Sequence, residues 1–142
     1  MSSSAVRARN TLELAKEAGA RRAIVLPVSV PSHCALMSDA AEHLKGELEN
    51  VEISTPSIPV IQNADVESFS DVAQIRDALV RQLFQPVQWT ATIIRLVEAG
   101  VTDFYECGPG KVLAGLNRRI NRESSITALT DLDTIAGSVS GE

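Results

Sequence analysis

The feature that most restricts the fold is a largely apolar, β-branched run over residues 23–30, which follows a helix-like segment, is interrupted by Pro27 and Ser29, and ends at Pro31. Continuous rather than alternating apolar residues are typical of a strand that is covered on both faces. Segments with helical periodicity and short apolar runs then alternate to the end of the chain. This alternation predicts an α/β fold with a largely parallel sheet.

Apolar spacing, caps and chain breakers predict the individual elements. Helices are expected over residues 5–18, 36–48, 71–83, 87–99, 112–120 and 131–138, and strands over 23–30, 60–61, 101–107 and 125–129. The strand over 101–107 is expected to be buried. Ser70 is expected to cap the third helix, while Gly19 and Gly100 should end the first and fourth. Pro86 should stop the third helix or begin the next one.

Composition excludes several classes of protein. The 142 residues carry a formal net charge of −5 and only 4% aromatic side chains, which argues against nucleic-acid binding. No apolar stretch approaches the roughly 20 residues of a membrane helix, and no secretion signal is apparent. Cys34 and Cys107 lack metal-ligand or disulfide spacing, so two reduced thiols, no metal and no cofactor are expected. We expect one domain in the cytoplasm.

His33 is the most informative candidate for chemistry. It follows the apolar run and precedes a helix, where catalytic loops of α/β sheets usually lie. Such a histidine can be a general base, or it can be a hydrogen-bonded structural residue. His43 falls on the polar face of its helix and is expected to face solvent.

A general base needs a nucleophile to activate, and the sequence offers none in a recognised pattern. Residues 137–141 resemble a nucleophile elbow but place Val139 at its centre. Cys34 is adjacent to His33, so its side chain should point away from the imidazole. The run 108–111 lacks the spacing of a phosphate loop and predicts a tight strand-to-helix turn, whose glycines let the backbone approach either an anion or another loop.

A cluster of arginines, Arg118, Arg119 and Arg122, stands out in an otherwise acidic chain. Most clusters of this kind are solvated faces. The functional alternative is docking of an acidic partner.

Three segments carry a resemblance to a known family. They are PVSVPSHCALM over 27–37, RDALVRQL over 76–83 with PVQW over 86–89, and ECGPGKVLAGL over 106–116. In this order and spacing they resemble the C-terminal part of bacterial malonyl-CoA:acyl carrier protein transacylases. The resemblance extends from about residue 5 to residue 131.

The resemblance implies transfer of malonyl from malonyl-CoA to the phosphopantetheine thiol of acyl carrier protein in fatty acid biosynthesis, through an acyl-serine. His33 would be the catalytic base, and the main-chain carbonyl of Gln82 would hold its other ring nitrogen. Ser32 and Val112 would line the acyl pocket. Arg118 and Arg119 match a basic surface that would meet the carrier protein.

The family fold implied by the resemblance is a hydrolase-like α/β acyltransferase domain with an inserted ferredoxin-like subdomain. Residues 1–30 would be the last helix and strand of that subdomain, and residues 31–142 the C-terminal part of the large domain. Family members are about twice as long as this chain. The nucleophilic serine, the oxyanion-hole donors and the arginine that pairs with malonyl would lie in the portion that this chain lacks.

Three hypotheses follow. The chain is a fragment that bears the base without the nucleophile and is inactive until the N-terminal half joins it, or it is a non-catalytic module that binds acyl carrier protein. Alternatively, the start at Met1–Ser4 is artificial and the chain alone has no function. A severed sheet would expose apolar faces, so self-association is expected.

Overall fold

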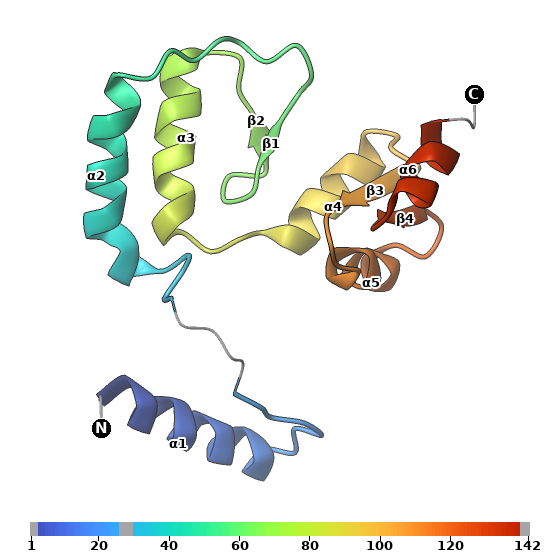
Figure 1. Cartoon of the computed structure of the whole chain (residues 1–142). Coiled ribbons are helices and arrows are strands. Elements are labelled where there is room, and N and C mark those ends of the chain that lie inside the picture. The colour runs from blue at the N-terminus through green and yellow to red at the C-terminus, as the bar shows by residue number, and fades with distance from the viewer. Residues whose placement is uncertain (1–2, 26–29, 140–142) are drawn as a thin grey trace. The chain divides into compact units, whose positions relative to one another are not determined.

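The computed structural model describes residues 3–25 and 30–139, with side chains described over 10–25 and 30–138. The chain forms two compact units, Met1–Pro31 and Ser32–Glu142. Figure 1 shows the elements along the chain. None of the described helices is both long and apolar enough to cross a membrane.

The first unit is built on one helix, α1 (Ser3–Glu17). Gly19 has a φ of 89°, and the N–H of Ala20 donates to the carbonyl of Ala15 across the helix end. A left-handed residue of this kind is the usual C-terminal cap, so the predicted role of Gly19 is confirmed.

The strand expected over 23–30 is not found in the described residues. Residues 23–25 and Val30 are irregular; Ala23 is half-buried, whereas Ile24, Val25 and Val30 are exposed, and residues 26–29 lie outside the described part. A strand needs a neighbour that satisfies its backbone N–H and C=O groups. In the described part of the chain, no strand pairs with residues 23–25 or with Val30, so their strand propensity alone does not produce a strand there.

The second unit begins with a short 3-10 helix, η1 (Ala35–Met37), followed by α2 (Ser38–Glu49) and α3 (Val72–Phe84). Helices α2 and α3 lie side by side (Figure 1), and Ala41, Ile75, Ala78 and Val80 are buried on them. Between these helices a hairpin pairs β1 (Ile61–Gln62) with β2 (Glu67–Ser68) in antiparallel fashion. The predicted strand at 60–61 is therefore displaced by one residue.

The start of α3 corrects one prediction. Asp71 rather than Ser70 is the N-cap, because its carboxylate accepts the N–H of Gln74 at 2.9 Å. A carboxylate at this position also complements the helix dipole. The end of α3 agrees with the prediction: Gln85 is extended, as expected for a residue before proline, and the helix stops ahead of Pro86.

The last part of the unit alternates helices and strands: α4 (Trp89–Glu98), β3 (Asp103–Cys107), α5 (Val112–Ile120), β4 (Ser125–Leu129) and α6 (Leu132–Val139). Strands β3 and β4 are parallel, from the pair Asp103 and Ser125 to the pair Cys107 and Leu129. Gly100, with a φ of 92°, ends α4 as predicted. The fold is therefore α/β.

The sheets are smaller than expected. The described residues form two separate two-stranded sheets, of which only β3–β4 is parallel. The prediction that 101–107 is buried is wrong. Asp103, Tyr105 and Cys107 are exposed, and the two residues between them are only half-buried. A parallel strand becomes buried only when neighbours and helices cover it on all sides. Among the described strands, β3 has β4 as its one neighbour.

Large apolar side chains remain at the surface. Among the described residues no large side chain is completely buried, whereas Val112 on α5 is 71% exposed and Leu132 on α6 is 82% exposed. The helix spacing therefore predicted an apolar face on α5 correctly, but the described structure leaves much of that face uncovered. Exposed apolar side chains of this kind are typical of a face that another partner covers.

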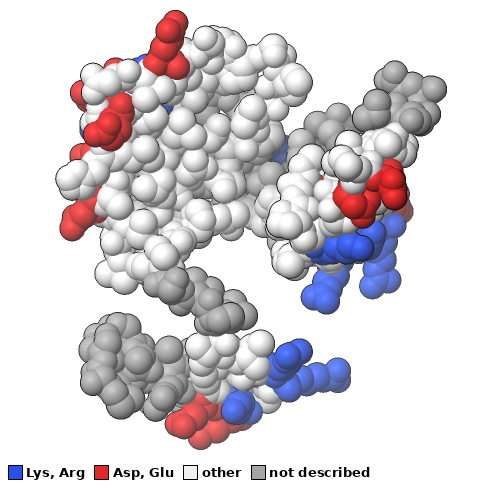
Figure 2. All heavy atoms as spheres, viewed as in Figure 1, with Lys and Arg blue, Asp and Glu red and all other residues white. Residues whose placement is uncertain are grey.

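Charged side chains are unevenly distributed. Figure 2 shows acidic groups along α2, and cationic groups gathered over the part of the unit that contains α5. The last turn of α5 carries Arg118 and Arg119. Positive charge near a helix C-terminus is electrostatically favourable, so this cluster also has a structural role.

Candidate active site

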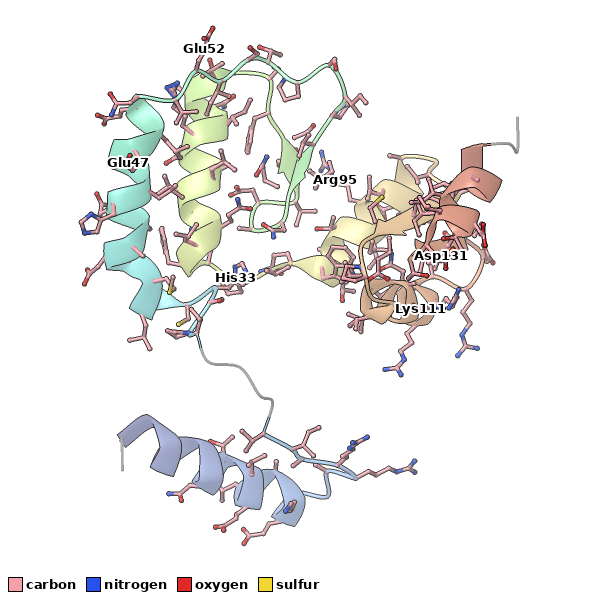
Figure 3. All side chains as sticks on the ribbon, in the orientation of Figure 1. His33, Glu47, Glu52, Arg95, Lys111 and Asp131 are labelled. Carbon is pink, nitrogen blue, oxygen red and sulfur yellow. The ribbon has the colours of Figure 1, made fainter. Side chains whose placement is uncertain are left out.

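His33 lies beside the C-terminal end of α3 (Figure 3) and makes two hydrogen bonds to it. Its backbone N–H donates to the carbonyl of Leu83 at 3.0 Å, and its ring Nδ1 lies 2.7 Å from the carbonyl oxygen of Gln82. Both acceptors belong to the last turn of α3. The structure thus brings together His33 and Gln82, residues separated by 49 positions.

The end of α3 is suited to hold an imidazole because the last carbonyls of a helix have no partner within it. In a continuing helix the carbonyl of Gln82 would accept the N–H of residue 86, but residue 86 is a proline and has no N–H. The helix has also stopped at Phe84. The Gln82 carbonyl is therefore available to a side chain from elsewhere.

The hydrogen bond defines the tautomer of the neutral ring. A carbonyl oxygen only accepts, so Nδ1 must carry the hydrogen and Nε2 keeps its lone pair. A neutral carbonyl orients the ring without placing a second charge next to it. His33 is exposed, so Nε2 can reach a group outside this chain. The arrangement is suited to general acid/base chemistry.

The backbone of His33 is also unusual. Its φ is 59°, in the left-handed region that few residues other than glycine adopt. The bond from its N–H to Leu83 anchors this conformation. Strained residues held by surrounding contacts are enriched at functional sites, and here the strain turns the ring towards the helix end.

The other predicted site residues are not joined to His33 by a hydrogen bond between described residues. Ser32 precedes His33 and is exposed, while Val112 is the first residue of α5. Arg118 and Arg119 are both exposed at the other end of α5, and Arg118 donates one N–H to the carbonyl of Ile126 at 2.8 Å. That bond holds part of the Arg118 guanidinium against β4. His43 is exposed, as predicted from its place on the polar face of its helix.

Sequence reasoning missed two side-chain contacts of the elements that carry predicted site residues. Arg81, in the last turn of α3, forms a bidentate ion pair with Asp65 in the β1–β2 turn. Glu106 on β3 accepts N–H groups from the first turn of α5. Glu106 therefore caps the N-terminus of α5, and a glutamate just before the 108–110 turn was a detectable signal for this role. Nothing in the sequence connects Asp65 with Arg81.

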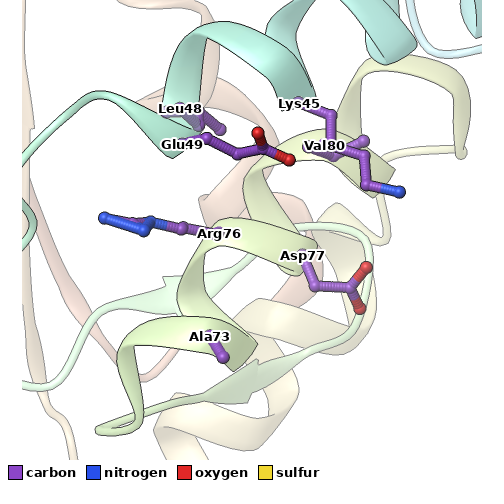
Figure 4. A pocket seen from close by; sticks show the side chains of 7 residues that line it. All are labelled: Lys45, Leu48, Glu49, Ala73, Arg76, Asp77 and Val80. Atoms are coloured by element: carbon purple, nitrogen blue, oxygen red, sulfur yellow. The ribbon is translucent and has the colours of Figure 1, made fainter.

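No group of three or more His, Cys, Asp or Glu side chains in the described residues could hold a metal ion. The two cysteines form no disulfide. A groove of about 210 Å³ lies between α2 and α3 (Figure 4). None of the predicted site residues lines it: its lining comprises Lys45, Leu48, Glu49, Ala73, Arg76, Asp77 and Val80. The groove is thus separate from the His33 site.

The fold and the site define a class: an α/β protein with a carbonyl-oriented histidine suited to acid/base chemistry. Comparison with known proteins shows which proteins the chain resembles. The chain is 53% identical over 116 residues to the malonyl CoA-acyl carrier protein transacylase of Salmonella typhimurium, and 46% identical over 123 residues to that of Bacillus subtilis. Over most of its length the chain is therefore similar to part of the malonyl CoA-acyl carrier protein transacylases.

The match extends over most of this chain but less than half of its relatives. The aligned region is 82% of this chain and 38% of the Salmonella protein, and 87% of this chain and 39% of the Bacillus protein. No family model matches the chain.

Comparison with solved structures points to the same group of proteins. An acyl carrier protein S-malonyltransferase from Vibrio cholerae superposes with a TM-score of 0.86 at 46% identity, covering 92% of this chain and 43% of that one. A malonyl-transacylase solved in complex with its type II polyketide acyl-carrier protein gives a TM-score of 0.90 at 43% identity, covering 94% of this chain and 43% of that one.

Proposed function

We propose that this chain supplies the acid/base part of malonyl transfer from malonyl-CoA to the phosphopantetheine thiol of acyl carrier protein in fatty acid biosynthesis. The observation that carries the proposal is the 2.7 Å contact between His33 Nδ1 and the Gln82 carbonyl. It leaves Nε2 as the basic nitrogen of an exposed ring, in a chain whose relatives are named malonyl CoA-acyl carrier protein transacylases.

His33 would act in both halves of the reaction. In the first, Nε2 takes the proton of a serine hydroxyl, the serine oxygen bonds to the malonyl carbonyl, and the thioester breaks. The proton then goes to the leaving coenzyme A thiolate. In the second, the carrier thiol gives its proton to Nε2 and its sulfur bonds to the carbonyl of the malonyl-serine. The serine ester bond then breaks, and Nε2 returns the proton to the serine oxygen. The serine would lie in the portion of the family that this chain does not span.

The remaining site residues have supporting roles in this proposal. Ser32 and Val112 would border the acyl pocket, consistent with their exposure and with the position of Val112 at the first turn of α5. Arg118 and Arg119 would meet the acidic carrier protein. The basic last turn of α5 supports this assignment, because the cations gathered there (Figure 2) attract an acidic surface.

The same proposal assigns the two units. Residues 1–30 would be the last helix and strand of the ferredoxin-like subdomain, and residues 31–142 the C-terminal part of the hydrolase-like domain. The chain spans about two fifths of its curated relatives. The remaining part of the family fold would cover the exposed apolar side chains of α5 and α6, and in its absence a second copy of the chain would do so.

A chimera tests the catalytic assignment. The matching segment of the Salmonella typhimurium relative is replaced by this chain, and malonyl transfer to acyl carrier protein is measured by intact mass. We expect transfer by the chimera, a loss of roughly 10²- to 10⁴-fold with His33→Ala, and little change with the control His43→Ala. Equal activity of the His33→Ala and His43→Ala chimeras would exclude His33 as the base.

A second function, a carrier-binding module without chemistry, is favoured by the neighbour solved with its carrier protein. Titration of labelled acyl carrier protein against the chain tests it, with the double variant Arg118→Glu/Arg119→Glu as the comparison. Binding that is abolished by the double variant supports the module. Absent binding, or binding that the variant leaves unchanged, contradicts it.

A further inference from the structure

We propose that the Asp65–Arg81 ion pair is a positioning device for His33, a role that rests on the proposed function of His33 as the base. The pair joins the β1–β2 turn to the last turn of α3. The carbonyls that hold His33 belong to the two residues that follow Arg81, namely Gln82 and Leu83.

The need for such a device follows from where the acceptors lie. The last turn of a helix frays more easily than its interior, because its carbonyls lack partners within the helix. If the last turn of α3 frays, the carbonyls move and the imidazole of His33 loses its fixed orientation. The Gln82 carbonyl therefore needs support from outside α3.

Asp65 provides this support with suitable geometry. Its two carboxylate oxygens accept from Arg81 Nε at 3.2 Å and from a terminal guanidinium nitrogen at 3.0 Å. The two side chains are only 26% and 19% exposed, so the pair is less screened than a surface ion pair. Arg81 also pairs with Asp77, one helical turn earlier on α3.

The β1–β2 turn contacts the segment beyond α3 as well. The N–H of Gln88 donates to the carbonyl of Asn63 at 2.7 Å. The turn is itself held in a fixed conformation, because Val66 has a φ of 59° and its N–H donates to the Gln62 carbonyl at 2.8 Å. One rigid turn thus fixes the chain on both sides of the Gln82 and Leu83 carbonyls.

The same hairpin offers a matched control. Glu67 forms a bidentate pair with Arg95, at 2.9 and 2.7 Å, but Arg95 lies on α4 and the pair is about half exposed. It has the same chemistry and starts from the same hairpin, yet it does not act on the last turn of α3. Removing the Glu67–Arg95 pair should leave the orientation of the His33 ring unchanged.

Nitrogen NMR of the imidazole rings in the full chain tests the proposal, at alkaline pH where imidazoles are neutral. His33 should show the Nδ1–H tautomer, and exposed His43 provides an internal reference. We expect Asp65→Asn to move the His33 ring resonances towards those of His43, Asp65→Glu to restore them, and Glu67→Gln to leave them in place. Amide spectra report whether each variant is folded.

The outcomes separate the two proposals. A wild-type His33 that already resembles His43 contradicts both the proposed function and this inference. A wild-type His33 in the Nδ1–H form that is unchanged by Asp65→Asn, or that moves equally with Glu67→Gln, overturns this inference alone. If Asp65→Asn does not fold, Arg81→Lys, which keeps the charge and loses the bidentate geometry, is measured instead, with the same two outcomes.

Discussion

The carboxylate of Glu106 accepts the backbone N–H of Ala114 at 2.7 Å, so a side chain of β3 caps the N-terminus of α5. Its second oxygen accepts the N–H of Leu113 at 3.2 Å. Both N–H groups are among those that a helix leaves without internal partners. The cap closes the turn over 108–111, where Gly108 has a φ of 158°. It thereby positions Val112, the proposed pocket residue.

Glu106→Ala should destabilise the second unit by about 0.5–2 kcal/mol, the usual effect of removing a helix cap. Trp89 is the only tryptophan of the chain and contacts α5 through Asn117, so its fluorescence reports on this region during urea unfolding. Glu98→Ala, at an exposed position on α4, is the control. Equal unfolding midpoints for the two variants would show that the cap contributes nothing.

Trp89 Nε1 donates to Asn117 Oδ1 at 2.9 Å, and Asn117 is only 6% exposed. Asn117→Ala should therefore cost about 1–3 kcal/mol, because it leaves the indole N–H half-buried without its acceptor. The free energy of unfolding from urea titration measures the effect. Asn50→Ala, on the exposed end of α2, should change it by less than about 0.5 kcal/mol. A smaller loss for Asn117→Ala than for Asn50→Ala would contradict the assignment.

Pro86→Ala should weaken the hold on His33. The substitution supplies an N–H that can compete for the Gln82 carbonyl and lets Gln85 become helical. In the Salmonella chimera we expect malonyl transfer to fall roughly threefold to tenfold, the loss of one net hydrogen bond. Pro59→Ala, in the exposed extended segment before β1, is the matched control. Retained activity in Pro86→Ala would show that the missing N–H is unimportant.

Asp131 should make the N-terminus of α6 sensitive to acid. The N–H of Thr134, then the Thr134 and Thr130 hydroxyls, hold the pKa of the Asp131 carboxyl below its ordinary value of 3.8. Its carboxylate accepts from Thr134 N–H at 2.9 Å. Because the folded pKa is lowered, the stabilisation is fully present above pH 3.8 and is lost as pH falls through the folded value.

The amide resonance of Thr134 followed in an acid titration checks this prediction. It should shift below pH 3.8 in the wild type. Asn caps a helix about as well as Asp but does not titrate in this range, so Asp131→Asn should keep the helix and lose the shift. An identical titration in both proteins would exclude Asp131 as its source.

The exposed apolar faces should cause the chain alone to associate. Light scattering should show a dimer or a larger species, because Val112 and Leu132 are 71% and 82% exposed. The double variant Val112→Glu/Leu132→Glu should shift the distribution towards monomer. A monodisperse wild-type monomer would contradict the expectation.

Local sequence determined most helices and their ends. The spacing of apolar residues predicted α1, α3 and α4 to within one or two residues of their observed bounds. Gly19, Pro86 and Gly100 marked the ends of these three helices, in that order. These signals act through bonds between residues three or four positions apart, so they are present in the sequence itself. Strand β4, with its β-branched residues, was predicted over its full length.

The segment over 23–30 and the burial of β3 could not be decided in the same way. Both depend on whether a neighbouring strand is present, which is a contact between distant parts of a chain. The sequence itself, through the position of His33 before a helix and its family resemblance, was enough to predict His33 as the proposed base.

Only the tertiary structure decided which groups hold His33. The Gln82 and Leu83 carbonyls meet His33 across about fifty positions, and Asp65 meets Arg81 across sixteen. Backbone carbonyls have no residue-specific signature, since every residue carries one. Which of them is left without a partner at a helix end, and which side chain reaches it, is settled only when the elements pack.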